Sequence, residues 1–167
     1  MAIEYQSAIV ADTVYSDGSL AARNATCTLP EISMVTAEIR AGGTIEAPVT
    51  GQVEAMEATI TTGAPDSGFT ALSQPGSHEV EVRWVQDSLG TDGTMRQVGC
   101  KAFMRAYAKT IPGISLEVGS ASENEVTLGV TRFQLVVDGE EQILIDQLNG
   151  IFKVGGTDYA AGIAALL

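Results

Sequence analysis

The dipeptide Asp-Gly occurs three times in the chain, at 17–18, 92–93 and 138–139, and each copy lies between two runs that read as β-strands. Both residues tolerate a positive φ, which the tightest turns between antiparallel strands require. A chain that turns back on itself in this way pairs consecutive strands directly. The three dipeptides therefore predict three β-hairpins, and with them an antiparallel β fold.

Short runs bounded by turn residues make up most of the remaining sequence. The strands at 53–62 and 78–87 alternate between apolar and polar residues, which is typical of a sheet with one buried face. In the strand at 125–137 the apolar residues change parity near Thr131, which predicts a bulge or a change of sheet there. The full set of expected strands is 5–15, 20–29, 32–39, 53–62, 78–87, 96–110, 125–137 and 142–145.

Helical patterns are few and short. One is expected at 66–72, with Asp66 or Ser67 as its N-cap, and a second at 158–167, weakened by Gly162. Because the strands follow one another without intervening helices, we predict a mainly β fold, an antiparallel sandwich or barrel with one or two short helices. The length of 167 residues suits a single domain over 1–167.

The charge balance argues against binding to nucleic acid. The chain has 21 acidic and 9 basic residues and a formal net charge of −12, whereas DNA binding requires lysine and arginine to neutralise phosphates. Charged residues make up only 18% of the chain, so much of its surface must be uncharged. Uncharged surface is often covered by partners, which favours an assembly subunit.

The N-terminal stretch and the two cysteines indicate a protein made in a reducing cytoplasm. The first 15 residues have no basic region, and Glu4 and Asp12 interrupt their apolar stretch, so we expect no secretory signal. The longest run without a charged side chain or histidine is about 11 residues, shorter than the ~20 that span a bilayer. We therefore expect Cys27 and Cys100 to stay reduced.

Residues that could support catalysis are scarce. His78 is the sole histidine, and no nucleophile motif accompanies it. Glu54 and Glu57 are three apart, so on a strand they point to opposite faces and cannot act as a paired acid and base. No phosphate-binding glycine motif and no metal-ligand spacing is present. We therefore predict no enzyme activity, no cofactor and no metal.

The strand at 96–110 permits two interpretations. Its basic residues share one parity with aromatic ones, a pattern that can bind single-stranded nucleic acid. Alternatively, the long stems of these basic residues cover apolar surface, or their charged ends meet acidic neighbours. The residues concerned are Lys101, Phe103, Arg105, Tyr107 and Lys109.

Several motifs appear together in a fixed order. In the first half they are LPEI at 29–32, RAGG at 40–43, APV at 47–49 and VEAMEA at 53–58. In the second half they are the stretch from Tyr107 to Pro112-Gly113, FQLVVDGEE at 133–141, IDQLN at 145–149 and VGGTD at 154–158. From about Leu29 to its end, the chain resembles the major tail tube proteins of contractile phage tails and R-type bacteriocins.

This resemblance implies a tail-tube-like β subunit that forms homohexameric rings, stacked into a hollow tube within a virion tail. Its partners would be further copies of itself, the tail sheath protein, the tape-measure protein, and the baseplate and tail terminator proteins. DNA would pass through the tube without specific binding, and assembly would take place in the host bacterial cytoplasm. An acidic lumen would repel the phosphates of that DNA.

Two sets of residues are candidates for sites in such a tube. We expect the segment from Arg40 to Pro48 to be a loop that contacts a neighbouring subunit or ring, because Gly42 and Gly43 let its backbone approach closely. On the strand at 53–62 we expect one face to line the lumen and the other to enter the core. The lumen candidates are Glu57, Thr59 and Thr61, and the core residues are Met56, Ala58 and Ile60.

Other functions remain open at this point. The tube protein of a type VI secretion system, or of another contractile injector, would share the same mechanics. A monomeric β-barrel that binds a small ligand would instead stay single in solution. An enzyme on a β-sandwich would need catalytic residues that the sequence does not supply.

Overall fold

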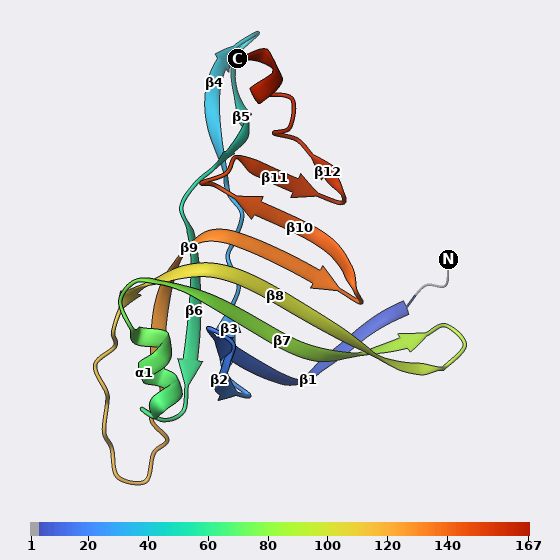
Figure 1. Cartoon of the computed structure of the whole chain (residues 1–167). Helices are drawn as coiled ribbons and strands as arrows, with labels where there is room; N and C mark the ends of the chain where they lie inside the picture. Colours follow the sequence, from blue (N-terminus) through green and yellow to red (C-terminus); the bar gives the residue numbers. More distant parts are fainter. Residues whose placement is uncertain (1–3) are drawn as a thin grey trace.

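The computed structural model describes residues 4–167 and is built almost entirely from antiparallel strands (Figure 1). Residues 1–3, which begin the stretch judged above to carry no secretory signal, lie outside the described residues. In chain order the elements are β1 Glu4–Ser16, β2 Ser19–Arg23, β3 Thr26–Thr28, β4 Met34–Arg40, β5 Thr44–Val53, β6 Met56–Thr62, α1 Ser67–Ser73, β7 Ser77–Gly90, β8 Met95–Thr110, β9 Asn124–Val137, β10 Glu140–Asp146, β11 Ile151–Val154, β12 Thr157–Asp158 and the 3-10 turn Ala164–Leu166.

All three Asp-Gly dipeptides form hairpin turns, as predicted. Asp17 and Asp138 each have a φ near +50°, and the φ of the glycine that follows each of them is also positive. This is the geometry of a tight two-residue turn. These turns join β1 to β2 and β9 to β10. The third dipeptide lies in a longer turn between β7 and β8, where Asp92 Oδ1 accepts a hydrogen bond from the Thr94 N–H.

Six neighbouring pairings close most of the strands into a barrel. The order β6–β9–β8–β7–β1–β2 is hydrogen-bonded throughout, and β3, which follows β2 after two residues, pairs back onto β6. The corner between β2 and β3 is fixed by Asp12, because its Oδ1 accepts from Ala25 N at 2.8 Å and its carbonyl accepts from Asn24 N at 3.0 Å. The structure thus confirms the predicted antiparallel β class.

Strand β9 belongs to two groups of strands at once. Its first half pairs with β6, and its second half pairs with β10, which begins a small outer sheet of β10, β11 and β12. The change occurs at Thr131, which the register with β8 skips and whose Oγ1 donates to the Arg105 carbonyl at 3.4 Å. The parity change in the sequence therefore marks both a bulge and a change of partner strand.

The core lies inside the barrel, beneath α1. Met56, Ala58 and Ile60 are all at most 3% exposed, as the alternation predicted. Helix α1 begins where expected, with Asp66 Oδ1 accepting the Phe69 N–H, and it buries Phe69 and Leu72 against the strands. The helix can lie this close because Gly68 has no side chain: a Cβ there would come 1.7 Å from the Ala21 carbonyl oxygen.

Four expectations about local structure were wrong. The strand expected at 20–29 is divided, since β2 ends at Arg23 and β3 begins at Thr26 and pairs with a different strand. The strand expected at 53–62 is divided, since β5 ends at Val53 and β6 begins at Met56. The helix expected at 158–167 is reduced to one 3-10 turn, which has no side-chain cap, while its first residue belongs to β12. The segment 40–48 is a β-hairpin tip instead of a loop.

Among residues 4–167, no helix is long and apolar enough to cross a membrane.

Candidate assembly surfaces

Strands β4 and β5 form a two-stranded ribbon, called here the arm, which comprises Met34–Val53 and projects from the rest of the molecule (Figure 1). It turns at Gly42 and Gly43, both with positive φ, and the Ala41 N–H donates to the Gly43 carbonyl at 2.9 Å. Within residues 4–167 these two strands pair only with each other. The structure therefore presents a narrow ribbon where the sequence predicted a loop.

The four residues predicted for the contact loop lie at three places on the arm. Gly42 and Gly43 make the turn at its tip, and Arg40 ends β4 with its Nε 3.8 Å from Glu38. Pro48 lies inside β5, opposite Thr36. A proline has no N–H to donate, and it is tolerated here because β5 has a free edge.

One face of the arm is apolar and the other is polar. Ile39 pairs with Ile45 and Ala37 pairs with Ala47 on the apolar face, while Glu38 and Glu46 pair on the opposite face. Ile39 and Ile45 are each 49% exposed. A two-stranded hairpin is marginally stable by itself in water. The exposed apolar face of the arm therefore favours a contact with another chain.

The arm is held to the rest of the molecule at its base. Gly51 has a φ of +74°, and a Cβ there would lie 3.2 Å from the Ala160 Cβ and 3.3 Å from the Ile163 Cδ1. Gln147 Nε2 also donates to the Val53 carbonyl at 2.8 Å. The C-terminal turns therefore pack on the base of the arm.

The lumen candidates lie together on the outer face of the barrel. Glu57 is exposed, and Thr59 and Thr61 are half-buried on the same side of β6. Glu57 Oε2 accepts a hydrogen bond from Lys109 Nζ at 2.7 Å, and both side chains are about half exposed. This face therefore presents a neutralised pair flanked by two hydroxyls.

Of the three basic residues named on this stripe, Arg105 and Lys109 meet acidic neighbours, as the second interpretation proposed, whereas Lys101 is exposed and has no acidic partner among the described residues. Arg105 Nε donates to Glu79 Oε1 at 3.0 Å, in addition to the pair between Lys109 and Glu57. The opposite face of β8 enters the core, with Ala102 and Met104 at most 1% exposed. The basic stripe is thus largely a set of ion pairs across neighbouring strands.

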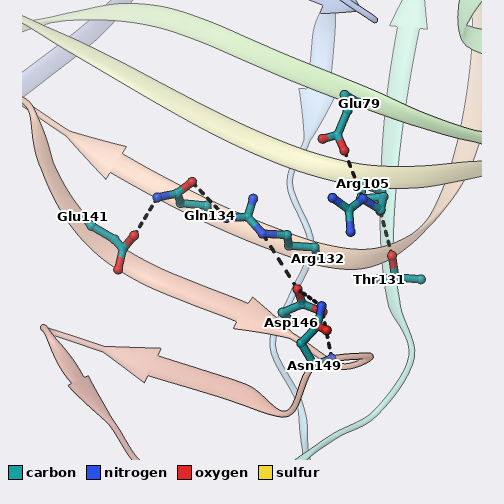
Figure 2. A network of polar contacts seen from close by, with 8 residues as sticks. All are labelled: Glu79, Arg105, Thr131, Arg132, Gln134, Glu141, Asp146 and Asn149. Atoms are coloured by element: carbon teal, nitrogen blue, oxygen red, sulfur yellow. Dashed lines mark hydrogen bonds and ion pairs between the residues drawn. The ribbon is translucent and has the colours of Figure 1, made fainter.

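A polar network joins β9, β10 and the turn that leads to β11 (Figure 2). Asp146 is 5% exposed and accepts both the Asn149 N–H at 3.2 Å and the Asn149 Nδ2 at 2.8 Å. Arg132 Nε lies 3.9 Å from the same carboxylate, and Gln134 Nε2 donates to Glu141 Oε2 at 2.6 Å. The network fixes the small outer sheet at the point where β9 changes partners.

Sequence reasoning quoted the stretch 145–149 only as a motif and missed this network. The signal that could have found it is an Asp followed three residues later by an Asn between two strand-like runs, which is a pattern for a side chain that closes a turn. The contribution of Arg132 has no local signal, because it comes from a different strand.

The model of the family described as phage tail tube protein FII matches residues 7–167. The chain belongs to this family. A tail tube protein of Escherichia phage P2 is 33% identical over 97 residues, which are 58% of this chain and 56% of that protein. The match thus spans little more than half the length of that relative.

Solved structures support the tail tube fold. A chain of the sheath-tube complex of an extracellular contractile injection system, PVC, in its extended state aligns with a TM-score of 0.53 at 17% identity, covering 75% of this chain and 87% of that one. A chain of the sheath/tube terminator of the same system aligns with a TM-score of 0.55 at 16% identity, covering 79% and 97%. At these identities the likeness concerns the fold.

In this tail tube family member, His78 joins the start of β7 to the first hairpin turn. Nδ1 is 2.8 Å from Asp17 Oδ2, and Nε2 is 3.0 Å from the Gln74 carbonyl. Both ring nitrogens face acceptors, so the imidazolium satisfies them and the neutral ring does not. The Asp17 carboxylate raises the pKa of His78, and hydrogen bonding by His78 lowers the pKa of Asp17.

We expect this pair to make stability depend on pH. The raised pKa of His78 adds stability that is complete below about pH 6.5, its ordinary pKa, and is lost as pH rises through the folded value. The lowered pKa of Asp17 adds stability that is lost as pH falls through its own folded value. His78→Gln should therefore cost up to about 1 kcal/mol near pH 5.5 and less at pH 9, measured by urea unfolding. An equal cost at both pH values would contradict this role.

Proposed function

We propose that this chain is the repeating subunit of the inner tube of a contractile phage tail or of a phage-tail-like bacteriocin. Six copies close into a ring, and rings stack into a hollow tube that guides DNA and penetrates the target envelope. The observation that carries the proposal is the arm, an amphipathic ribbon whose apolar face a single copy leaves open. Membership of the tail tube family over residues 7–167 supports it.

The same proposal assigns a role to the face of Glu57, Thr59 and Thr61, which lines the lumen. Support comes from the pairing of Lys109 with Glu57 and of Arg105 with Glu79, because such pairs leave few free cations to hold DNA phosphates. The net charge of −12 adds repulsion that acts within a Debye length of about 8 Å at physiological salt. DNA then passes without specific binding.

The remaining partners follow from this function. The tube is surrounded by a sheath protein, templated by a tape-measure protein, and bounded by baseplate and terminator proteins. It forms in the host bacterial cytoplasm and ends in the virion tail, where its task is mechanical and not enzymatic. The tube of an extracellular or type VI injection system is the second candidate, favoured by the likeness in fold to the PVC chains.

Negative-stain electron microscopy of the purified chain tests the proposal. We expect six-fold rings and tubes of uniform width, and size-exclusion chromatography should give an elution volume that depends on concentration. A chain that stays single at high concentration and forms neither rings nor tubes would support the monomeric β-barrel instead.

The lumen assignment is tested by labelling Glu57→Cys with a small maleimide and with one attached to a bulky polymer. We expect both reagents to label the unassembled chain, and only the small one to label tubes rapidly, because the bulky one is excluded from a narrow bore. The wild-type chain gives a low background, since burial raises the pKa of Cys27 to about 12 and Cys100 is buried.

Two results of this labelling would contradict the assignment. Rapid reaction of tubes with both reagents places position 57 on the outside of the tube. Protection of tubes from both reagents places it between subunits.

A further inference from the structure

The segment 111–123, between β8 and β9, is a second surface whose apolar side chains are exposed in a single copy. Its apolar side chains are open to solvent: Leu116 is 86% exposed and Val118 is fully exposed, and Ile111 and Ile114 are also exposed. Side chains added at Gly113 or Gly119 would meet no atom within 4 Å. Within residues 4–167, only Pro112 and Ser122 of this segment are half-buried, and the rest of it is exposed.

The segment has the pattern of a β-strand but lacks a partner strand. Ile114, Leu116 and Val118 alternate with Ser115 and Glu117, which is the period of a strand with one apolar side. Within residues 4–167, its only backbone hydrogen bond joins the Ser120 N–H to the Glu117 carbonyl at 3.2 Å. Unpaired backbone and exposed aliphatic side chains together are what an added strand supplies to another sheet.

The arm and this segment lie at opposite ends of the molecule (Figure 1). The tip of the arm is at one end, and the segment 111–123 loops out at the other, beyond α1. The two surfaces also complement each other, because the arm has two strands with free edges and an apolar face, whereas the segment has a single strand-like run with an apolar side. No copy can bring its own arm to its own segment.

We propose that in the assembled tube the segment 111–118 of one copy packs along the apolar face or free edge of the arm of a copy in the adjacent ring. This inference rests on the proposed tube function and names the surfaces that stack the rings. Every copy carries both surfaces, so the contact is head to tail, and a contact of this kind between adjacent rings allows open-ended growth.

Cysteine cross-linking tests the direct contact. Ile39→Cys or Ile45→Cys is combined in one chain with Ile114→Cys, Leu116→Cys or Val118→Cys, so that alternate positions cover the unknown register. Oxidised tubes from at least one combination should give a ladder of dimers, trimers and longer products on a non-reducing gel. Each chain with one introduced cysteine should give no ladder. Ile39→Cys combined with Met95→Cys, at the start of β8 beside the β7–β8 turn, should also give none.

The outcomes separate this inference from the proposed function. If tubes form and no combination gives a ladder, the contact is overturned while the tube function stands. If the wild-type chain forms no rings or tubes, the proposed function itself fails, and this inference fails with it.

A second variant measures the contribution of the segment. Leu116→Asp should raise the protein concentration needed for tubes at least about tenfold, because an apolar contact is replaced by a charge. The thermal unfolding of the unassembled chain should not change, since the side chain is 86% exposed there. Tubes forming at the wild-type concentration would contradict the inference.

Discussion

Gly68→Ala should destabilise the unassembled chain by at least about 3 kcal/mol, although alanine is the better helix former by about 1 kcal/mol. Gly68 lies in the first turn of α1 and has an ordinary φ, so its backbone does not demand glycine. The reason is contact: the added Cβ would lie 1.7 Å from the Ala21 carbonyl oxygen and 2.6 Å from its carbonyl carbon. Both are backbone atoms of β2, so relief requires the helix to move away from the barrel.

Urea unfolding of the unassembled chain measures this effect. Thr70→Ala on the exposed side of α1 is the matched control, since it also places alanine in the helix and removes only the exposed hydrogen bond from Thr70 Oγ1 to the Asp66 carbonyl. Its stability should stay within about 0.5 kcal/mol of wild type. A Gly68→Ala chain as stable as wild type would show that the helix does not need its close approach to β2.

The double variant Ile39→Asp, Ile45→Asp should abolish tubes at concentrations where the wild-type chain forms them. These side chains are cross-strand neighbours on the apolar face of the arm, and each is about half exposed in one copy. Fully burying an isoleucine contributes about 2 kcal/mol, so charging both positions in every subunit should raise the required concentration at least about 100-fold. Removal of residues 41–47 should have the same result.

The matched control places the same charges on the other face of the arm. Thr36→Asp, Thr44→Asp changes the net charge equally, but both positions belong to the polar side, so tubes should still form. Circular dichroism and thermal unfolding of both unassembled variants should match wild type, because all four side chains are exposed and belong to a separate two-stranded sheet. Normal tubes from the isoleucine variant would remove the arm from the assembly interface.

Much of the barrel could be predicted because its signals are local. A positive φ at Asp17 and Gly18 is needed by the turn itself, so the dipeptide predicts the hairpin without knowledge of the rest. The parity change at Thr131 likewise follows from two successive stretches that bury opposite sides of one strand. Alternation placed Met56, Ala58 and Ile60 in the core and left Glu57 on the opposite face.

The arm was misread because its residues break strands in most settings. Gly42, Gly43 and Pro48 read as a loop, yet two of them form a tight turn and the third lies on a free edge, where a missing N–H costs little. Whether a proline lies on a free edge depends on whether any other strand of the chain pairs with that edge, which the local sequence does not show. The prediction of a helix at 158–167 was wrong for a similar reason. This segment lacks a side-chain cap, and Ala160 and Ile163 pack on Gly51 instead.

The ion-pair partners of the candidate site residues could not be predicted from the sequence either, because they depend on which strands pair. Lys109 is 52 residues from Glu57, and Arg105 is 26 residues from Glu79, so no spacing rule joins them. The choice between lumen and outer surface for Glu57, Thr59 and Thr61 stays a prediction, since it depends on neighbouring copies.

The division of β9 between two sets of strands has a mechanical consequence. A force on the arm can reach the barrel by two routes: directly along the backbone from β5 into β6, and through the contacts of Gly51 with the C-terminal turns and then the ladders of β11, β10 and β9. Antiparallel ladders pulled along their length share the load among many hydrogen bonds, whereas ladders peeled from one end break them singly. The strand that changes partners at Thr131 therefore ties the small outer sheet to the barrel through backbone hydrogen bonds on both of its edges.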